Sequence, residues 1–508
     1  MNNMIRAAFI AVFFITIVTG CTSPKTERGE LYQALIDYES EFWFDRSISH
    51  VLLNRMVSNN TQVVWSTNFH TAAPVPLGAV GPHKYINKLK GIIHNDSIGR
   101  VLKEAVADGV NIITVIGDGM GNMHMALPVY MRYAQNNPQA SMFEKIMAEG
   151  STGYVYTSTI RGLVTGSAAS GTAIACGQKT MMNMIGVDST GTPLTSVMTL
   201  AKQNGYRTAL VTNASITDAT PAAFYAHTVN RNEENKIAQQ LVSSHTVDVI
   251  MGGGGQHFIP QGKSLFEMLD VKEANNYTSA RKDTLNLLKD LGSNAYQLIH
   301  NKKELSQLDE STLKVAGFFA AGGLPAPINY EQERTMAPTL GEMSLKSLSL
   351  VQNKTKPYIA VIECARIDWE SHDNDIGAVY KSVENMNEIL KTAYSFYSMN
   401  PDNTLLLFTS DHETGGLEIA YRKMPKEYQE EKILSTGKSW SNDTNPLSYE
   451  RYIATLNQQK KTVSFVLRQS HTVKELKQNA KKYLGIRLSD QEADLLLYAM
   501  KDYQKYKD

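Results

Sequence analysis

A serine at the start of a run of small residues is the first candidate for chemistry in this sequence. Ser167 follows Thr165 and Gly166 and opens the segment 167–177, in which nearly every residue is small. The pattern predicts a sharp turn into a helix, and the free N–H groups at a helix N-terminus favour an anion. A serine hydroxyl there could attack an electrophile whose negative charge is held by the same helix end. The alternative is that Ser167 only caps a tightly packed helix, because serine is a preferred N-cap residue.

Several carboxylates and two histidines follow the predicted strands of the chain. β-branched runs at 110–116, 206–212, 247–251, 358–363 and 404–409 alternate with helical patterns. This alternation is typical of βαβ units that form a mainly parallel sheet. In such sheets, sites form beyond the carboxyl ends of the strands. The residues expected there are Asp118, Asp218, the glycines 252–255, Glu363 with Asp368 and His372, and Asp411 with His412.

The charge of this set predicts metal ions. Each residue alone is explained equally well as a turn aspartate, a helix cap or a core histidine. Together, five carboxylates in one crevice would repel one another unless cations lie between them. Mixed Asp and His ligands suit zinc, and oxygen ligands alone suit magnesium. Asp368 and His372 are four residues apart, which places them on one face of a helix. A serine beside two metals is equipped for displacement at phosphorus.

In this order, the motifs resemble those of the alkaline phosphatase family. The resemblance runs from about Asn111 to Tyr421 and includes the blocks 117–121, 164–170, 218–227, 252–255, 337–343, 363–372 and 410–416. It implies an α/β fold, a three-layer α/β/α sandwich around a mainly parallel sheet. It also implies that small-molecule phosphate monoesters are the substrates. A catalytically impaired relative that still binds metal or phosphate is the alternative.

The resemblance assigns a role to each matched residue. Ser167 would form a phosphoserine, and Arg231 would hold two phosphate oxygens with its guanidinium fork. A first zinc, which activates Ser167, would be held by Asp118, Asp411 and His412. A second zinc, at the leaving oxygen, would be held by Asp368 and His372. Magnesium would be held by Asp218, Thr220 and Glu363, and Asp118 would be shared between the first zinc and magnesium. The cofactors expected are therefore up to two Zn²⁺ and one Mg²⁺.

Two departures from the family pattern stand out. Much of the family has an aspartate directly before the serine that helps to orient the arginine, and here that residue is Gly166. The family also supplies a third histidine to the second zinc from a Trp-Thr-Thr-x-x-His-Thr strand after the Asp-His pair. Beyond His412 the chain has only His471, whose surroundings indicate the start of a helix. We therefore expect Asp368 and His372 to bind zinc loosely, without a third protein ligand, and turnover to be slow.

The N-terminus predicts export and a lipid anchor. Arg6 and the apolar run 7–19 are typical of a signal peptide, because a membrane-spanning helix needs about 20 apolar residues. The run ends at Cys21 in a sequence that resembles a bacterial lipobox, where lipid is attached to the cysteine. This predicts a membrane-anchored protein of the bacterial envelope, on its periplasmic or outer-membrane side. The alternative is a plain signal peptide with an incidental cysteine.

The remaining sequence sets the expected domain organisation. A signal peptide at 1–20 precedes a tether and extension at 21–105, to which no chemistry is assigned because its histidines lack metal-ligand spacing. The core is expected at 106–422 and a charged helical segment at 423–508, with a capping box at Ser489 and Glu492. Lys and Arg together number 50, as do Asp and Glu, so no basic surface predicts nucleic acid as a partner. A homodimer is left open.

Overall fold

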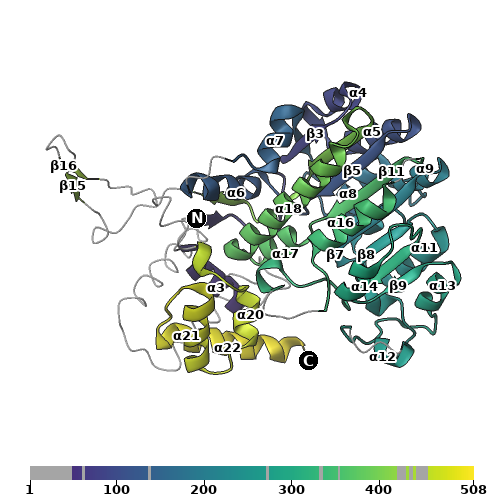
Figure 1. Ribbon diagram of the computed structural model, residues 1–508. Helices are drawn as coiled ribbons and strands as arrows, with labels where there is room; N and C mark the ends of the chain where they lie inside the picture. The colour runs from purple at the N-terminus through teal and green to yellow at the C-terminus, as the bar shows by residue number, and fades with distance from the viewer. Residues whose placement is uncertain are drawn as a thin grey trace.

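Helices cover both faces of one large β-sheet, so the fold is a three-layer α/β/α sandwich (Figure 1). The computed structural model describes residues 48–59, 63–135, 139–269, 274–330, 336–352, 355–419, 431–433, 439–441 and 456–507. Within these residues the large sheet has ten strands, in the order β4-β6-β3-β12-β5-β11-β7-β8-β10-β9. The predicted fold class is confirmed.

The predicted strands form the centre of this sheet. In chain order the ten strands are β3 (Val75–Val80), β4 (Gly91–His94), β5 (Asn111–Ile116), β6 (Ser151–Tyr156), β7 (Arg207–Ser215), β8 (Val249–Gly253), β9 (Gln297–Ile299), β10 (Val315–Phe318), β11 (Tyr358–Glu363) and β12 (Thr404–Thr409). The five strands predicted from β-branched runs are β5, β7, β8, β11 and β12. They are neighbours, and every pairing among them is parallel. Their carboxyl ends therefore meet at one edge of the sheet.

The two helical layers bury opposite sides of these strands. On β11, Ile359 and Val361 pack into one layer, and Ala360 and Ile362 pack into the other. The first layer contains α5 (Asn95–Ala107), α8 (Ser167–Cys176), α9 (Val197–Gln203), α10 (Ala219–Ala222), α11 (Glu234–Ser244), α12 (Leu265–Met268) and α13 (Leu287–Ser293). The second contains α6 (Asn122–Ala134), α7 (Met142–Glu149), α14 (Lys302–Gln307), α16 (Leu340–Val351), α17 (Arg366–His372) and α18 (Ile376–Tyr397).

The extension before residue 105 is an integral part of the sheet. β3 lies between β6 and β12, antiparallel to both, and all six of its residues are buried. β4 pairs with β6, and a short helix, α4 (His83–Ile86), connects β3 towards β4. The boundary expected at residue 105 is therefore wrong, because it falls inside α5, whose buried face packs against α8.

Two small antiparallel pairings bring residues 63–71 onto the loop that follows β12. β1 (Val63–Trp65) pairs with β14 (Leu417–Ile419), and β2 (His70–Thr71) pairs with β13 (Glu413–Thr414). Within β2 and β13, His70 lies opposite Thr414. A segment from near the start of the chain is thus held against the end of the core.

The segment predicted as helical, 423–508, contains a pair of short antiparallel strands, β15 (Glu431–Ile433) and β16 (Ser439–Ser441), and its described residues from 456 onward are mainly helical. α20 (Val463–Arg468), α21 (Val473–Asn479) and α22 (Asp490–Lys507) gather around α3 (Ile48–Asn59), which comes from the opposite end of the described chain (Figure 1). The predicted capping box is present, since the Ser489 N–H donates to Glu492 and the Glu492 N–H donates to the Ser489 hydroxyl. Of the helices in the described chain, none has the length and apolar character needed to cross a bilayer.

Candidate active site

A cleft opens at the carboxyl ends of the central strands. It has a volume of about 520 Å³, and its lining includes six of the predicted site residues, namely Asp118, Ser167, Asp218, Arg231, Asp368 and His372. The other four, Thr220, Glu363, Asp411 and His412, are buried beneath it. Nine of these ten residues follow β5, β7, β11 and β12 or lie on α8, α10 and α17, and Arg231 lies in the loop between α10 and α11. The structure therefore brings the predicted set to one edge of the sheet.

The Ser167 hydroxyl is directed at a histidine. Gly166 is the N-cap of α8, and Ser167 is the first helical residue. Its Oγ lies 3.2 Å from Nε2 of His412. The alternative that Ser167 is only a cap is therefore not what the structure shows. Small residues let α8 pack closely on α10, because a Cβ at Gly171 of α8 would lie only 3.3 Å from the backbone of Thr220 in α10.

Asp118, Asp411 and His412 form the first group that fits a metal ion. One ligand atom from each lies within 4.8 Å of the others, and all three residues are buried. Asp118 Oδ1 and Asp411 Oδ2 have no hydrogen-bond partner, and they lie 3.5 Å and 3.3 Å from His412 Nε2. Burial and neighbouring carboxylates raise the pKa of Asp411 to about 7 and that of Asp118 well above its usual range. Two orphaned buried carboxylate oxygens facing an imidazole are the donor set of a divalent cation.

The residues expected around magnesium lie next to this group. The Thr220 hydroxyl donates to Asp118 Oδ2 over 3.1 Å. Glu363 is buried at the end of β11, where it accepts a hydrogen bond from Thr212, and burial with the nearby charge of Asp218 raises its pKa to about 8. An all-oxygen set of this kind suits magnesium. Asp118, Thr220 and Glu363 are therefore brought together as expected.

Asp218, the remaining residue expected at magnesium, contacts Arg231. Its Oδ1 lies 2.7 Å from Nη2 of Arg231, in an ion pair at the edge of the cleft. The same oxygen accepts the N–H of Ala219 over 2.6 Å, which caps α10. Asp218 thus contacts the arginine that is expected to hold phosphate.

Asp368 and His372 lie on one face of α17, as their spacing predicts. His372 Nε2 is 3.3 Å from Asp368 Oδ2. His372 Nδ1 lies 2.5 Å from the carbonyl oxygen of Asn68. Because a carbonyl only accepts, the proton is on Nδ1, and the lone pair of Nε2 is on the side of Asp368.

The expectation that Asp368 and His372 lack a third protein ligand is wrong, because His70 joins them. His70 Nε2 lies 3.1 Å from His372 Nε2 and 3.8 Å from Asp368 Oδ1. Its ring stacks on that of His412, with 3.7 Å between centroids, and burial lowers its pKa, which favours the neutral imidazole. His70 Nδ1 faces the carbonyl of Thr165, so Nε2 is again the free nitrogen. Two imidazole lone pairs beside a carboxylate fit zinc, which takes three protein ligands at catalytic sites.

The sequence contained a signal for His70. Residues 65–71 read Trp-Ser-Thr-Asn-Phe-His-Thr, which differs from the expected Trp-Thr-Thr-x-x-His-Thr pattern only at Ser66. The pattern was expected after His412, and it stands more than 300 residues before it. His471, the other candidate, is exposed just before α21.

Thr414 links the two metal groups. Its hydroxyl lies 2.5 Å from Asp368 Oδ1 and 3.2 Å from His412 Nδ1. The hydroxyl proton goes to the carboxylate, so His412 Nδ1–H donates to the hydroxyl oxygen. His412 Nε2 is then free to face Ser167 and the first metal group. Such outer partners orient metal ligands and fix their tautomers.

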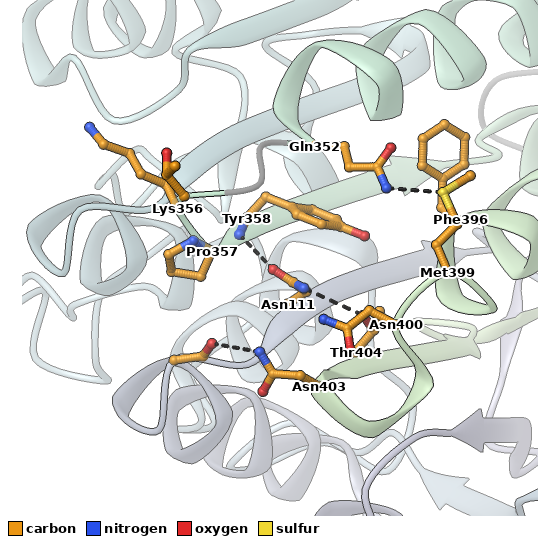
Figure 2. Close-up of a pocket in the computed structure, with 12 residues that line it drawn as sticks. Asn111, Gln352, Lys356, Pro357, Tyr358, Phe396, Met399, Asn400, Asn403 and Thr404 are labelled. Atoms are coloured by element: carbon orange, nitrogen blue, oxygen red, sulfur yellow. Dashed lines mark hydrogen bonds between the residues drawn. The ribbon is translucent and has the colours of Figure 1, made fainter.

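A second cavity lies at the opposite edge of the sheet. Its volume is about 780 Å³, and it sits at the amino ends of β5, β11 and β12, where Asn111, Tyr358 and Thr404 line it (Figure 2). Hydrogen bonds join Asn111 to Tyr358 and to Thr404. Among its described lining residues there is no carboxylate, histidine or cysteine. The chemistry of the described chain is therefore at the carboxyl edge.

Comparisons with known proteins show which family the chain resembles. Residues 110–492 match the family model of alkaline phosphatase. Alkaline phosphatase 4 of Bacillus subtilis (strain 168) is 31% identical over 347 residues, which are 66% of this chain and 68% of that protein. The repressible alkaline phosphatase of Saccharomyces cerevisiae is 32% identical over 343 residues, which are 64% of this chain and 58% of that protein.

Solved structures show the same likeness. The alkaline phosphatase of Thermus thermophilus superposes with a TM-score of 0.64 at 26% identity, over 78% of this chain and 77% of that chain. A cold-active alkaline phosphatase from a psychrophilic Shewanella sp. gives a TM-score of 0.57 at 26% identity, over 78% and 88% of the two chains. The fold and site define a phosphomonoesterase. The chain belongs to the alkaline phosphatase family.

Proposed function

We propose that this protein hydrolyses phosphate monoesters through a phosphoserine on Ser167. The observation that carries the proposal is the 3.2 Å approach of Ser167 Oγ to His412 Nε2, at the border of two groups of ligands. The first N–H groups of α8 and the guanidinium of Arg231 flank the same cleft and supply positive charge to a bound phosphate. This arrangement suits phosphoryl transfer better than acyl transfer, because acidic metal ligands surround the serine.

The donor sets fit the metals that the family uses. The first zinc would be held by Asp118, Asp411 and His412, the second by His70, Asp368 and His372, and magnesium by Asp118, Thr220 and Glu363. When bound, these ions would lower the pKa of the serine hydroxyl and neutralise phosphate oxygens.

The chain's own residues perform the remaining steps. Arg231 binds and orients the phosphate, and Ser167 Oγ forms a bond to phosphorus as the bond from phosphorus to the alcohol oxygen breaks. The alcohol leaves after taking up a proton. Water then attacks the phosphoserine, so that inorganic phosphate leaves and the Ser167 hydroxyl is restored. Burial of His412 and Asp411 beneath the serine keeps bulk water away from its far side.

The test is hydrolysis of p-nitrophenyl phosphate by the full chain loaded with zinc and magnesium. The wild type should release p-nitrophenol and yield an acid-stable phosphoserine, and Ser167→Ala should abolish both. Ser170→Ala is the comparison, because the Ser170 hydroxyl holds the backbone carbonyl of Asp411 and does not face the cleft. We expect Ser170→Ala to lower stability with far less effect on the phosphoserine. Metal binding without any turnover would favour the alternative, an impaired relative.

We also propose that the protein is anchored to a bacterial envelope membrane through a lipid on Cys21. The support is the lipobox-like sequence at 18–21, which lies outside the described residues. Several acyl chains, as on bacterial lipoproteins, anchor stably where one does not. Mass spectrometry of the mature N-terminus should find a lipid-modified Cys21. A mature chain that begins elsewhere, without lipid, would contradict the proposal.

A further inference from the structure

The structure of the site raises the question of which residue orients the side chain of Arg231. The family's aspartate before the serine is Gly166 here, so that position offers no carboxylate. A Cβ built on Gly166 would face Met182 Sδ at 3.3 Å and His70 Cε1 at 3.6 Å. A guanidinium that binds phosphate needs a second anchor, because a free arginine loses side-chain entropy on binding. Another group must therefore hold Arg231.

Asp218 has the geometry of that anchor. Its Oδ1 lies 2.7 Å from Arg231 Nη2, and both side chains are partly open to the cleft, at 26% and 30% exposure. The carboxylate is itself fixed, since the N–H of Ala219 donates to the same oxygen. The Arg231 backbone is fixed as well, by its N–H bond to the carbonyl of Asn183 over 3.0 Å. Asp218 engages one N–H of Nη2, and the second Nη2 N–H, together with Nη1 or Nε, is left for two phosphate oxygens.

We propose that Asp218 is the positioning residue for Arg231 in this chain and takes over the role that Gly166 cannot fill. This rests on the proposed function, because the group positioned is the phosphate clamp. The role differs from the magnesium ligation expected for Asp218. Oδ1 of Asp218 is already engaged by Arg231 and Ala219.

A double-mutant cycle on phosphate binding tests this role. The metal-loaded full chain carries Ser167→Ala throughout, so that calorimetric titration with inorganic phosphate does not depend on turnover. Asp218→Asn should weaken phosphate binding roughly 10-fold. In an Arg231→Ala background the same change should have no further effect, and magnesium content per chain should stay the same. In the active enzyme, Asp218→Asn should raise KM more than it lowers kcat.

Glu233→Gln is the matched control, because Glu233 lies near Arg231 in sequence but contacts Thr228 and Lys236. It should leave phosphate binding unchanged. Equal weakening by Asp218→Asn in both backgrounds, or loss of magnesium, would show that Asp218 acts through the metal and would overturn the proposal. A Ser167→Ala chain with bound metals and no affinity for phosphate would instead count against the proposed function itself.

A second inference concerns the order in which the motifs of the family occur along this chain. The family match begins at residue 110, yet residues 63–80 supply His70 to the site and β3 to the middle of the sheet. β1 pairs with β14 in antiparallel register, with Val63 opposite Ile419, so the segment that carries His70 lies directly against the strands that follow Asp411 and His412. The Trp65–Thr71 motif stands before the core although the family pattern sets it after the Asp-His pair. We infer that the chain is a circular permutant of its family, with the family's closing segment moved to the front.

Reordering the chain tests the permutation. The sequence 110–508 followed by 48–109 should align with the family in one continuous match that extends through His70. The corresponding protein, joined by a flexible linker, should fold and bind the same number of zinc ions, because α3 and α22 are in contact. Two linker lengths guard against a linker that is too short. The inference would be overturned if the family match of the reordered sequence still excluded residues 48–109, or if the reordered chain folded but bound one zinc ion fewer.

Discussion

The three imidazoles of the site are each held through one ring nitrogen. Nδ1 of His70 faces the carbonyl of Thr165, Nδ1 of His372 faces the carbonyl of Asn68, and Nδ1 of His412 faces the Thr414 hydroxyl. Each contact fixes the Nδ1–H tautomer, so that all three Nε2 atoms turn towards the carboxylates. At the scale of single residues, the ligand set is therefore preorganised by groups that do not touch the metal.

Replacing His70 tests its role as a ligand. His70→Ala leaves the second group with two protein ligands, and even the loss of an outer partner of a metal ligand costs 10–100-fold in affinity or activity. We expect His70→Ala to lower zinc affinity by roughly 100-fold or more and the zinc content by one per chain, measured by elemental analysis after mild dialysis against chelator. His471→Ala is the control and should keep its zinc. Equal zinc in both variants would contradict the assignment.

The sequence predicted most ligands but not this one, for a physical reason. Asp118, Glu363, Asp411 and His412 follow directly from strands whose β-branched runs are visible, so parallel pairing alone gathers them. His70 reaches the site through the pairing of two-residue strands that are distant in sequence, and local patterns carry no signal of such pairing. Arg231 was predicted by resemblance, while its contact with Asp218 depends on side-chain geometry.

At the scale of elements, the close packing of α5 and α8 places Ser167. A Cβ at Gly99 of α5 would lie 2.4 Å from the backbone N of Gly177, directly after α8. The absence of a side chain thus lets the two helices approach at backbone distance. Because α8 carries Ser167 at its first turn, the packing of α8 on α5 contributes to the position of Ser167 relative to His412.

Gly99→Ala should therefore be destabilising although it adds a good helix former. Overpacking against a rigid backbone costs about 1–3 kcal/mol, which exceeds the gain of about 1 kcal/mol from helix propensity. Gly292→Ala in α13 is the matched control, because a Cβ there meets nothing within 4 Å. We expect Gly292→Ala to stabilise slightly in urea unfolding and Gly99→Ala to lower both stability and kcat. Two stabilising substitutions would show that α5 and α8 can move apart.

β3 shows why one element escaped prediction. Its sequence contains Pro76 and Gly78, residues that argue against a central strand. Gly78 is required because a Cβ there would lie 2.4 Å from the ring of Phe408 on β12. The carbonyl of Pro76 still accepts a bond from the Thr409 hydroxyl. The strand is specified by its partners in the sheet, and single-sequence patterns do not contain them.

At the scale of the whole molecule, Asp375 joins the core to the C-terminal helices. Asp375 is buried at the start of α18, where Val463 N–H donates to its Oδ2 over 2.7 Å and Gln459 donates to its Oδ1. Burial outweighs these hydrogen bonds, and the nearby Asp373 adds to it, so that the pKa of Asp375 rises to about 6. The C-terminal segment is therefore docked through a carboxyl that holds its proton in mildly acidic solution.

This pKa predicts a pH dependence of folding. In the unfolded chain Asp375 ionises near its ordinary value of 3.8, and in the folded chain near 6, so the favourable contribution is complete below about pH 4 and is lost as pH rises through 6. The loss amounts to about 3 kcal/mol. The stability advantage of the wild type over Asp375→Asn, measured by urea unfolding of metal-loaded protein, should shrink by about that amount between pH 4 and 7. A constant difference across this range would contradict the shift.

Because of its place in the sheet, β3 is synthesised long before its partner strand β12. The bond from Thr409 to Pro76 joins residues that are 333 positions apart. At 5–20 residues per second, the ribosome needs roughly 15 to 70 seconds to add β12 after β3 has emerged. Throughout that interval the nascent chain contains the apolar strand β3 without its partner β12. For most of the same interval Asp368 and His372, which lie beside His70 in the folded protein, have not yet been synthesised. On the proposed assignment of ligands, the second zinc would bind only after Asp368 and His372 have joined His70, and a chain cut short before residue 368 would not hold it.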